Sequence, residues 1–108
     1  MKQKTITLPR LNRLSPTMES TALKLMEEAG ELAQAIGKFR GLNGELARKE
    51  DEQVVRLIVQ ELLDVAQTAV SMMFVLEEQY QVDIEKAVES HLEKLVKKGY
   101  LSIAPRDE

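Results

Sequence analysis

The stretch from Asp51 to Gln79 constrains the fold of this chain more than any other segment. It contains neither glycine nor proline, and its apolar residues recur at helical spacing. Because successive helical residues turn by about 100°, these side chains cover about two-thirds of the helix circumference. One helical partner needs a narrower apolar stripe. We therefore predict a helix buried on more than one side, in an all-α helical bundle that assembles as an oligomer.

Two further helices are predicted from their end signals. Ser-Pro at 15–16 suits the cap and first turn of a helix that ends near Phe39, before the glycines of residues 40–45. Asp83 suits the cap of a last helix, which ends at Gly99. The whole chain contains few helix breakers, with only five glycines and three prolines in 108 residues.

The length is sufficient for one domain. Residues 1–15 are basic and irregular, and we predict an N-terminal arm that is either loose or packed on a partner. Residues 16–100 form the predicted helical domain, and residues 101–108 form a frayed C-terminal tail. A core of this size is marginal alone, which favours self-association.

Composition and charge exclude several classes of protein. The absence of cysteine excludes disulfides, zinc–thiolate sites and thiol nucleophiles. The net charge of −3 argues against a nucleic-acid groove. The N-terminus lacks a signal-like apolar run, and no stretch is expected to reach membrane-spanning length. We therefore expect a cytoplasmic location, with neither a membrane nor a nucleic acid as partner.

Carboxylates occur in the two longer helices where core residues belong. Glu28 lies at the edge of the apolar side of the first helix, and Glu31 lies beside it. In the second helix, Glu61 points into the apolar sector and Asp64 lies at its border. No basic residue is expected at matching positions, so packing would bring four carboxylates together without a nearby cation. Buried carboxylates require a partner, a proton or a metal.

A divalent cation is the simplest compensation for these charges. Oxygen ligands suit Mg²⁺ or Mn²⁺, and the single histidine, His91, does not fit the Glu-x-x-His pattern of di-iron bundles. Mg²⁺ on carboxylates retains coordination positions for phosphates. The residues thus favour hydrolysis of a phosphoanhydride, with one carboxylate orienting or deprotonating the water. An isolated Glu-x-x-Glu pair would more commonly lie on a solvated helix face.

Two short motifs resemble a known family. "EEAGE" at 27–31 and "ELLD" at 61–64 resemble the E-E-x-x-E … E-x-x-D signature of the MazG-like, all-α nucleoside triphosphate pyrophosphohydrolases, and the resemblance extends over residues 16–100. It implies a helical homodimer or homotetramer. It also implies Mg²⁺-dependent hydrolysis of nucleoside triphosphates to monophosphates and pyrophosphate, to remove non-standard or excess nucleotides.

The resemblance also implies roles for individual residues. Glu28, Glu31, Glu61 and Asp64 match the metal-binding and catalytic acids, and Glu27 matches the leading acid of the first motif. Basic residues near the helix ends either bind substrate phosphates or only complement the helix dipole. The candidate substrate-binding residues are Lys38, Lys94, Lys97, Lys98 and Tyr100.

Two alternatives to a house-cleaning hydrolase remain open at this stage. A pathway enzyme resembling phosphoribosyl-ATP pyrophosphatase would use the same site chemistry, and only substrate tests separate it. A non-catalytic helical interaction or regulatory protein would retain the fold without turnover. For such a protein, we expect Glu28→Gln and Glu61→Gln to stabilise the metal-free fold. Neither change would cost any activity.

Overall fold

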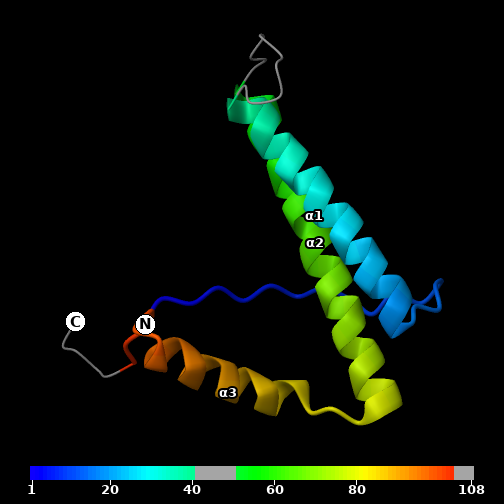
Figure 1. Cartoon of the computed structure of the whole chain (residues 1–108), viewed down its shortest axis with the longest axis vertical. Coiled ribbons are helices and arrows are strands. Elements are labelled where there is room, and N and C mark those ends of the chain that lie inside the picture. The colour runs from blue at the N-terminus through cyan, green and yellow to red at the C-terminus, as the bar shows by residue number, and fades with distance from the viewer. Residues whose placement is uncertain (41–50, 104–108) are drawn as a thin grey trace.

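The computed structural model describes residues 1–40 and 51–103, and this part of the chain contains three helices and no strand (Figure 1). The helices are α1 (Met18–Arg40), α2 (Asp51–Tyr80) and α3 (Ile84–Lys97). This confirms the all-α prediction. The predicted glycine-containing connection and the end of the predicted tail lie outside the described residues.

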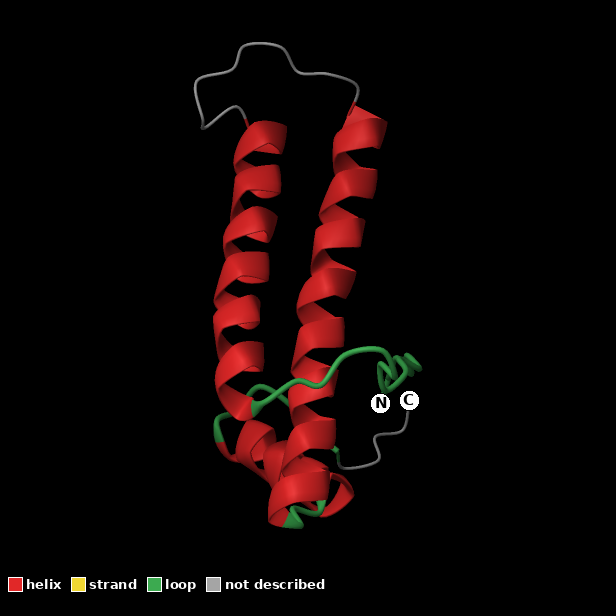
Figure 2. Ribbon diagram, turned by 90° about the vertical axis from the view of Figure 1, so that its right-hand side faces the viewer, coloured by secondary structure: helices red, strands yellow, loops and turns green. Residues whose placement is uncertain are grey.

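The first two helices form an antiparallel hairpin, in which they lie side by side along their lengths (Figure 2). α3 leaves the lower end of this hairpin crosswise and has little contact with either helix (Figure 1). The radius of gyration is 17.5 Å, against about 13 Å for a compact domain of this length. Within the described residues, only Ala35 and Val75 are buried apolar side chains. A single chain therefore has a very small core.

The start of α1 differs from the prediction. Thr17, not Ser15, is the capping residue: its Oγ1 accepts a 3.0 Å hydrogen bond from the backbone N–H of Ser20. The Ser20 Oγ in turn accepts a 2.9 Å hydrogen bond from the Thr17 N–H. This reciprocal pair satisfies two backbone donors at the helix start. The prediction that Ser15 caps the helix is wrong by two residues.

Both ends of α3 follow the predicted signals. Asp83 is the N-cap and accepts a 3.0 Å hydrogen bond from the N–H of Lys86. At the other end, Gly99 has φ +81°, a conformation that favours glycine. Gly99 N–H donates to Val96 O, and Tyr100 N–H donates to Leu95 O, each at 3.0 Å. These two bonds form a Schellman motif that ends the helix.

The contact between α1 and α2 follows one row of residues on each helix. Steps of four and three residues alternate along each row, which is the spacing of a coiled-coil seam. We call these the inner rows. They comprise Thr21, Leu25, Glu28, Leu32 and Ala35 of α1, and Val54, Ile58, Glu61, Val65, Thr68, Met72 and Val75 of α2. Every member is buried or half-buried.

On each helix, the residues one position after those of the inner row form a second row with the same spacing. We call these two second rows together the apolar face. The apolar face comprises Ala22, Met26, Ala29, Ala33 and Ile36 of α1, and Val55, Val59, Leu62, Ala66, Ala69 and Met73 of α2. On each helix, the second row is rotated by about 100° around the helix axis from the inner row, in the same sense along the chain. Because the helices are antiparallel, the two rows point to the same side of the hairpin. Met26 is 74% exposed and Leu62 is 52% exposed.

The N-terminal arm covers the opposite side of α2. Arg10 donates two hydrogen bonds to Glu78, from Nε at 2.6 Å and from Nη2 at 3.0 Å. Gln67 Nε2 donates a 2.8 Å hydrogen bond to the carbonyl oxygen of Pro9. Gln67, Ser71, Phe74 and Glu78 follow one side of α2, which we call the arm face. The sequence predicted an arm that is loose or packed on a partner, but residues 9–16 lie against their own α2.

The expectation that no stretch reaches membrane-spanning length is wrong for α2. Glu52–Tyr80 is the one helix among the described residues that is long enough for a span and has an 18-residue window with a mean hydropathy of 1.3. This is weak evidence, because the core helix of a soluble protein meets the same criteria. Glu61 and Asp64 also lie in α2, and carboxylates are unfavourable at the centre of a bilayer.

Candidate functional site

Three carboxyl groups meet where α1 faces α2. Glu28, Glu31 and Glu61 each place one oxygen so that all three atoms lie within 4.8 Å of one another. Glu28 and Glu61 belong to the inner rows, and Glu31 lies one helical turn after Glu28. We call these three residues the acid cluster. The sequence predicted that acids from both helices would converge, and these three do.

Two oxygen atoms of the acid cluster are buried without a hydrogen-bond partner in the described part of the chain. They are Oε1 of Glu28 and Oε1 of Glu61. Glu28 as a whole is only 8% exposed. A buried polar atom without a partner destabilises a fold by about 1–3 kcal/mol. A positively charged ligand between the facing helices would satisfy both atoms.

Lys24 provides positive charge on one side of the acid cluster. Its Nζ lies 3.4 Å from Glu28 Oε2 and 3.2 Å from Glu27 Oε1. The prediction that no cation lies near these acids is therefore wrong. Hydrogen bonds with Glu27 and Glu28, followed by their charges, raise the pKa of Lys24. One lysine cannot balance the acid cluster and Glu27 together.

The acids of the cluster influence one another. The close approach of the Glu28 carboxyl group, by hydrogen bonding and then by charge, raises the pKa of Glu31. Desolvation and the charges of Glu61 and Glu27 add smaller effects in the same direction. A raised carboxyl pKa means that neighbouring negative charge disfavours ionisation. A cation at this position would relieve that repulsion.

Asp64 lies beside the acid cluster instead of within it. It is exposed and, with Glu28, forms one wall of a pocket of about 440 Å³. Ligand pockets commonly have volumes of about 300–1,000 Å³. Polar pocket-lining side chains are Ser20, Thr21, Lys24, Gln67, Thr68 and Ser71. The arm contributes Leu11, Leu14, Ser15 and Pro16. The predicted group of four acids is therefore a cluster of three, with the fourth facing the adjoining pocket.

The acid cluster fits a hard divalent cation. It offers only oxygen atoms, which Mg²⁺ and Mn²⁺ prefer in proteins. In octahedral Mg²⁺ coordination, two oxygens lie about 3.0 Å apart if adjacent and about 4.2 Å apart if opposite, so an ion would draw the three oxygens, which lie within 4.8 Å of one another, closer together. The partnerless oxygens of Glu28 and Glu61 are the atoms that such an ion would satisfy.

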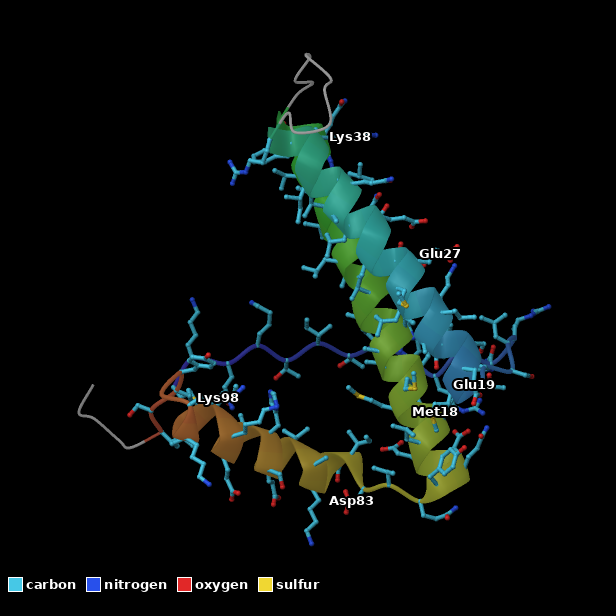
Figure 3. All side chains as sticks on the ribbon, in the orientation of Figure 1. Met18, Glu19, Glu27, Lys38, Asp83 and Lys98 are labelled. Carbon is cyan, nitrogen blue, oxygen red and sulfur yellow. The ribbon has the colours of Figure 1, made fainter. Side chains whose placement is uncertain are left out.

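Of the other predicted residues, Glu27 lies beside the acid cluster, and the remaining five lie away from it in a single chain (Figure 3). Glu27 projects from the side of the hairpin away from α3, where it pairs with Lys24 (Figure 3). Lys38 lies near the end of α1, and Lys98 lies at the far end of α3 (Figure 3). Lys94 and Lys97 line a shallow hollow on α3, and Tyr100 is 75% exposed. A substrate role for these four candidates and for Lys38 stays a prediction that requires a neighbouring chain.

Sequence reasoning missed Lys24 and the arm residues that line the pocket. Lys24 precedes Glu28 by four residues, and side chains four apart in a helix are neighbours. The four-residue spacing could therefore have predicted the contact between Lys24 and Glu28. Leu11 and Leu14 lie in an irregular segment, which lacks a periodicity to place them.

Comparison with known proteins identifies a family for most of the chain. Residues 16–99 match the family model described as the MazG nucleotide pyrophosphohydrolase domain. The matched residues include all three described helices, the acid cluster and Asp64. Searches of curated proteins and of solved structures gave no significant match. The match confirms the resemblance that the two acidic motifs indicated.

Proposed function

Because the chain belongs to the MazG nucleotide pyrophosphohydrolase family, we propose that it hydrolyses nucleoside triphosphates with Mg²⁺, or with Mn²⁺ in its place. One water cleaves the bridge between the α- and β-phosphates, and the products are a nucleoside monophosphate and pyrophosphate. The main structural observation in support of this proposal is that one carboxylate oxygen each of Glu28 and Glu61 is buried without a hydrogen-bond partner. Removal of non-standard or excess nucleotides in the cytoplasm is the role that we propose for this reaction.

The proposed roles follow from the position of each carboxylate. Glu28, Glu31 and Glu61 hold the ion, and Asp64 is the fourth carboxylate at the pocket edge. Bound there, the ion would neutralise negative charge on the phosphates. One of the four carboxylates orients the attacking water and accepts its proton. Lys24 lines the same pocket and supplies a positive charge for a phosphate oxygen.

Pyrophosphate release from a panel of ribo- and deoxyribonucleoside triphosphates tests this proposal. We expect turnover by the wild type with Mg²⁺, and a decrease in kcat/KM of about 100-fold or more for Glu61→Gln. Glu89→Gln, the same change at an exposed position of α3, is the matched control and should retain wild-type activity. Full activity of Glu61→Gln would contradict the proposed site.

The same panel separates the alternatives. Phosphoribosyl-ATP as the one efficient substrate would identify a pathway enzyme, whereas preference for modified bases would support house-cleaning. A wild type that binds Mn²⁺ but hydrolyses no member of the panel would favour a non-catalytic interaction or regulatory protein.

We also propose that a second copy covers the apolar face, in a homodimer or homotetramer. Alternating steps of four and three residues on both helices suit packing of one hairpin on another as a four-helix bundle. Alanines at 29, 33 and 66 would allow close approach of the facing helices. Glu27 belongs to the opposite side and projects away from α3, so the apolar face and α3 share a side (Figure 3). A second hairpin seated there would also adjoin α3.

A further inference from the structure

The N-terminal arm is attached to α2 at two points about three helical turns apart. Gln67 holds the backbone at Pro9, and Glu78 holds the guanidinium of Arg10 through two hydrogen bonds. Bidentate pairs of this kind fix direction as well as distance. The arm therefore has a defined path over the arm face before it reaches the Thr17 cap.

This path places apolar arm residues over the pocket beside the acid cluster. Leu11, Leu14 and Pro16 form its outer wall, while Glu28 and Asp64 form part of its inner wall. Leu14 is 64% exposed although it lines the pocket. An exposed leucine facing a pocket is a surface that a bound apolar group would cover.

The pocket lining thus combines two chemically different groups of residues. The carboxylates and Lys24 suit a metal-bound phosphate chain, whereas the arm offers aliphatic surface that packs against a flat ring. Ser20, Gln67 and Ser71 add hydrogen-bonding groups to the same pocket lining. A nucleotide combines parts that match these groups: phosphates, a sugar with hydroxyl groups and a planar base.

We propose that the N-terminal arm is the wall against which the nucleoside half of the substrate packs, and that the Arg10–Glu78 ion pair positions this wall. Leu11, Leu14 and Pro16 are the contacting residues, and Arg10 and Glu78 are positioning residues that act through them. The proposal rests on the proposed function, because it names where that substrate's nucleoside binds.

Steady-state kinetics on the best triphosphate of the panel tests the positioning pair. Arg10→Ala and Glu78→Ala should each raise KM about tenfold and leave kcat at saturating substrate within about twofold. The two single variants change the net charge in opposite directions, so an increase of KM in both is not what a role limited to net charge would predict. The charge-swapped double variant Arg10→Glu/Glu78→Arg should restore KM, because it allows the ion pair to form again. Arg13→Ala, an exposed arginine on the same arm, is the matched control and should leave KM unchanged.

Leu14 tests the wall itself. Leu14→Ser removes aliphatic surface and should raise KM about tenfold, while Leu14→Met retains size and apolarity and should keep KM near the wild-type value. Inorganic tripolyphosphate, which lacks a nucleoside, should inhibit the wild type and all these variants with the same Ki. A parallel rise of that Ki would overturn the proposal, because the arm would then act on the phosphates or on the whole fold.

The outcomes distinguish this proposal from the proposed function. If the wild type hydrolyses the substrate and the arm variants have an unchanged KM, the proposed role of the arm is wrong. The proposed hydrolase function would not be affected by that result. If the wild type shows no turnover, NMR titration with the four common nucleoside monophosphates still decides the question. Binding that weakens in Arg10→Ala would support the pocket, and absence of binding to all four would overturn it.

Discussion

The two sides of the α1–α2 hairpin differ in what covers them. On the arm face, the chain covers α2 with its own residues 9–16, held by Gln67 and Glu78. On the apolar face, the structure shows no covering segment from the described residues, and Met26 and Leu62 remain more than half exposed. Both sides have regular helical spacing. Periodicity therefore indicates that a helix side is to be buried, but not whether the same chain or another one buries it.

The acid cluster lies between these two sides. Glu28 and Glu61 belong to the inner rows, so the packing of α1 on α2 brings their carboxylates together. The arm forms the pocket on one side of this row, and the proposed second copy would exclude water from the other. The following predictions test whether the two sides have these separate roles.

The largest effect is expected for Leu62→Glu on the apolar face. A charge in the middle of a helix–helix interface would be buried without a partner, which destabilises association by about 3–5 kcal/mol. We expect the oligomer to dissociate to monomers in size-exclusion chromatography with light scattering.

Gln53→Glu is the control for this change. It adds the same charge to α2 at an exposed position outside the apolar face, and the oligomer should persist. A Leu62→Glu protein with the mass of the wild-type assembly would show that the interface lies elsewhere.

A smaller effect is expected for Glu61→Gln in the metal-free protein. The change removes one negative charge from the acid cluster and supplies an amide N–H₂ that donates to Glu28 or Glu31. The free energy of unfolding should rise by about 1 kcal/mol without metal. Mg²⁺ should raise the Tm of the wild type but not that of the variant.

Differential scanning calorimetry with and without Mg²⁺ measures both effects. Glu89→Gln should respond to Mg²⁺ as the wild type does. Equal Mg²⁺ responses of wild type and Glu61→Gln would exclude the acid cluster as the metal site.

Much of the fold could be predicted because the signals were local. The period of α2, the Asp83 cap and Gly99 each act within a few residues of where they appear. Convergence of Glu28 and Glu61 also followed from period alone, since Glu28 lies at the edge of the apolar side of α1 and Glu61 lies within the apolar sector of α2. Family membership then followed from the same acids in their helical context.

The remainder depended on contacts between distant residues. Ser15 and Thr17 are both good caps, and the choice between them depends on how the arm approaches α1. The ion pair between Arg10 and Glu78 joins residues 68 positions apart, and a lone arginine in an irregular segment does not indicate its partner. The arm wall of the pocket could not be predicted for this reason.

The Thr17 cap, where the arm joins the hairpin, gives the next prediction. Thr17→Ala removes the acceptor for the Ser20 N–H and should lower the free energy of unfolding by about 1 kcal/mol. Ser15→Ala, at the position that the sequence suggested as the cap, should change stability by less than half of that amount. Urea unfolding of both variants measures the difference. A larger loss of unfolding free energy for Ser15→Ala than for Thr17→Ala would show that Ser15, the predicted residue, caps the helix.

The smallest expected effect is a pH dependence of arm docking. The hydrogen bond from Arg10, assisted by its charge, lowers the pKa of Glu78 below its ordinary value of 4.5. Because the folded pKa is below the unfolded one, this contribution is fully present above about pH 4.5 and is lost as the pH falls through the folded pKa. The effect is small because both side chains are about half exposed.

NMR of the Leu11 amide between about pH 7 and pH 3 measures this release. In Glu78→Gln, the amide should resemble that of the acidified wild type throughout, whereas Glu77→Gln, at the adjacent exposed position, should titrate like the wild type. A wild-type arm that stays docked after Glu78 is protonated would mean that the Gln67–Pro9 bond and the leucines hold it without the ion pair. The arm face would then resemble the apolar face in depending mainly on apolar contact, and the proposed positioning role of Arg10 would lose its physical basis.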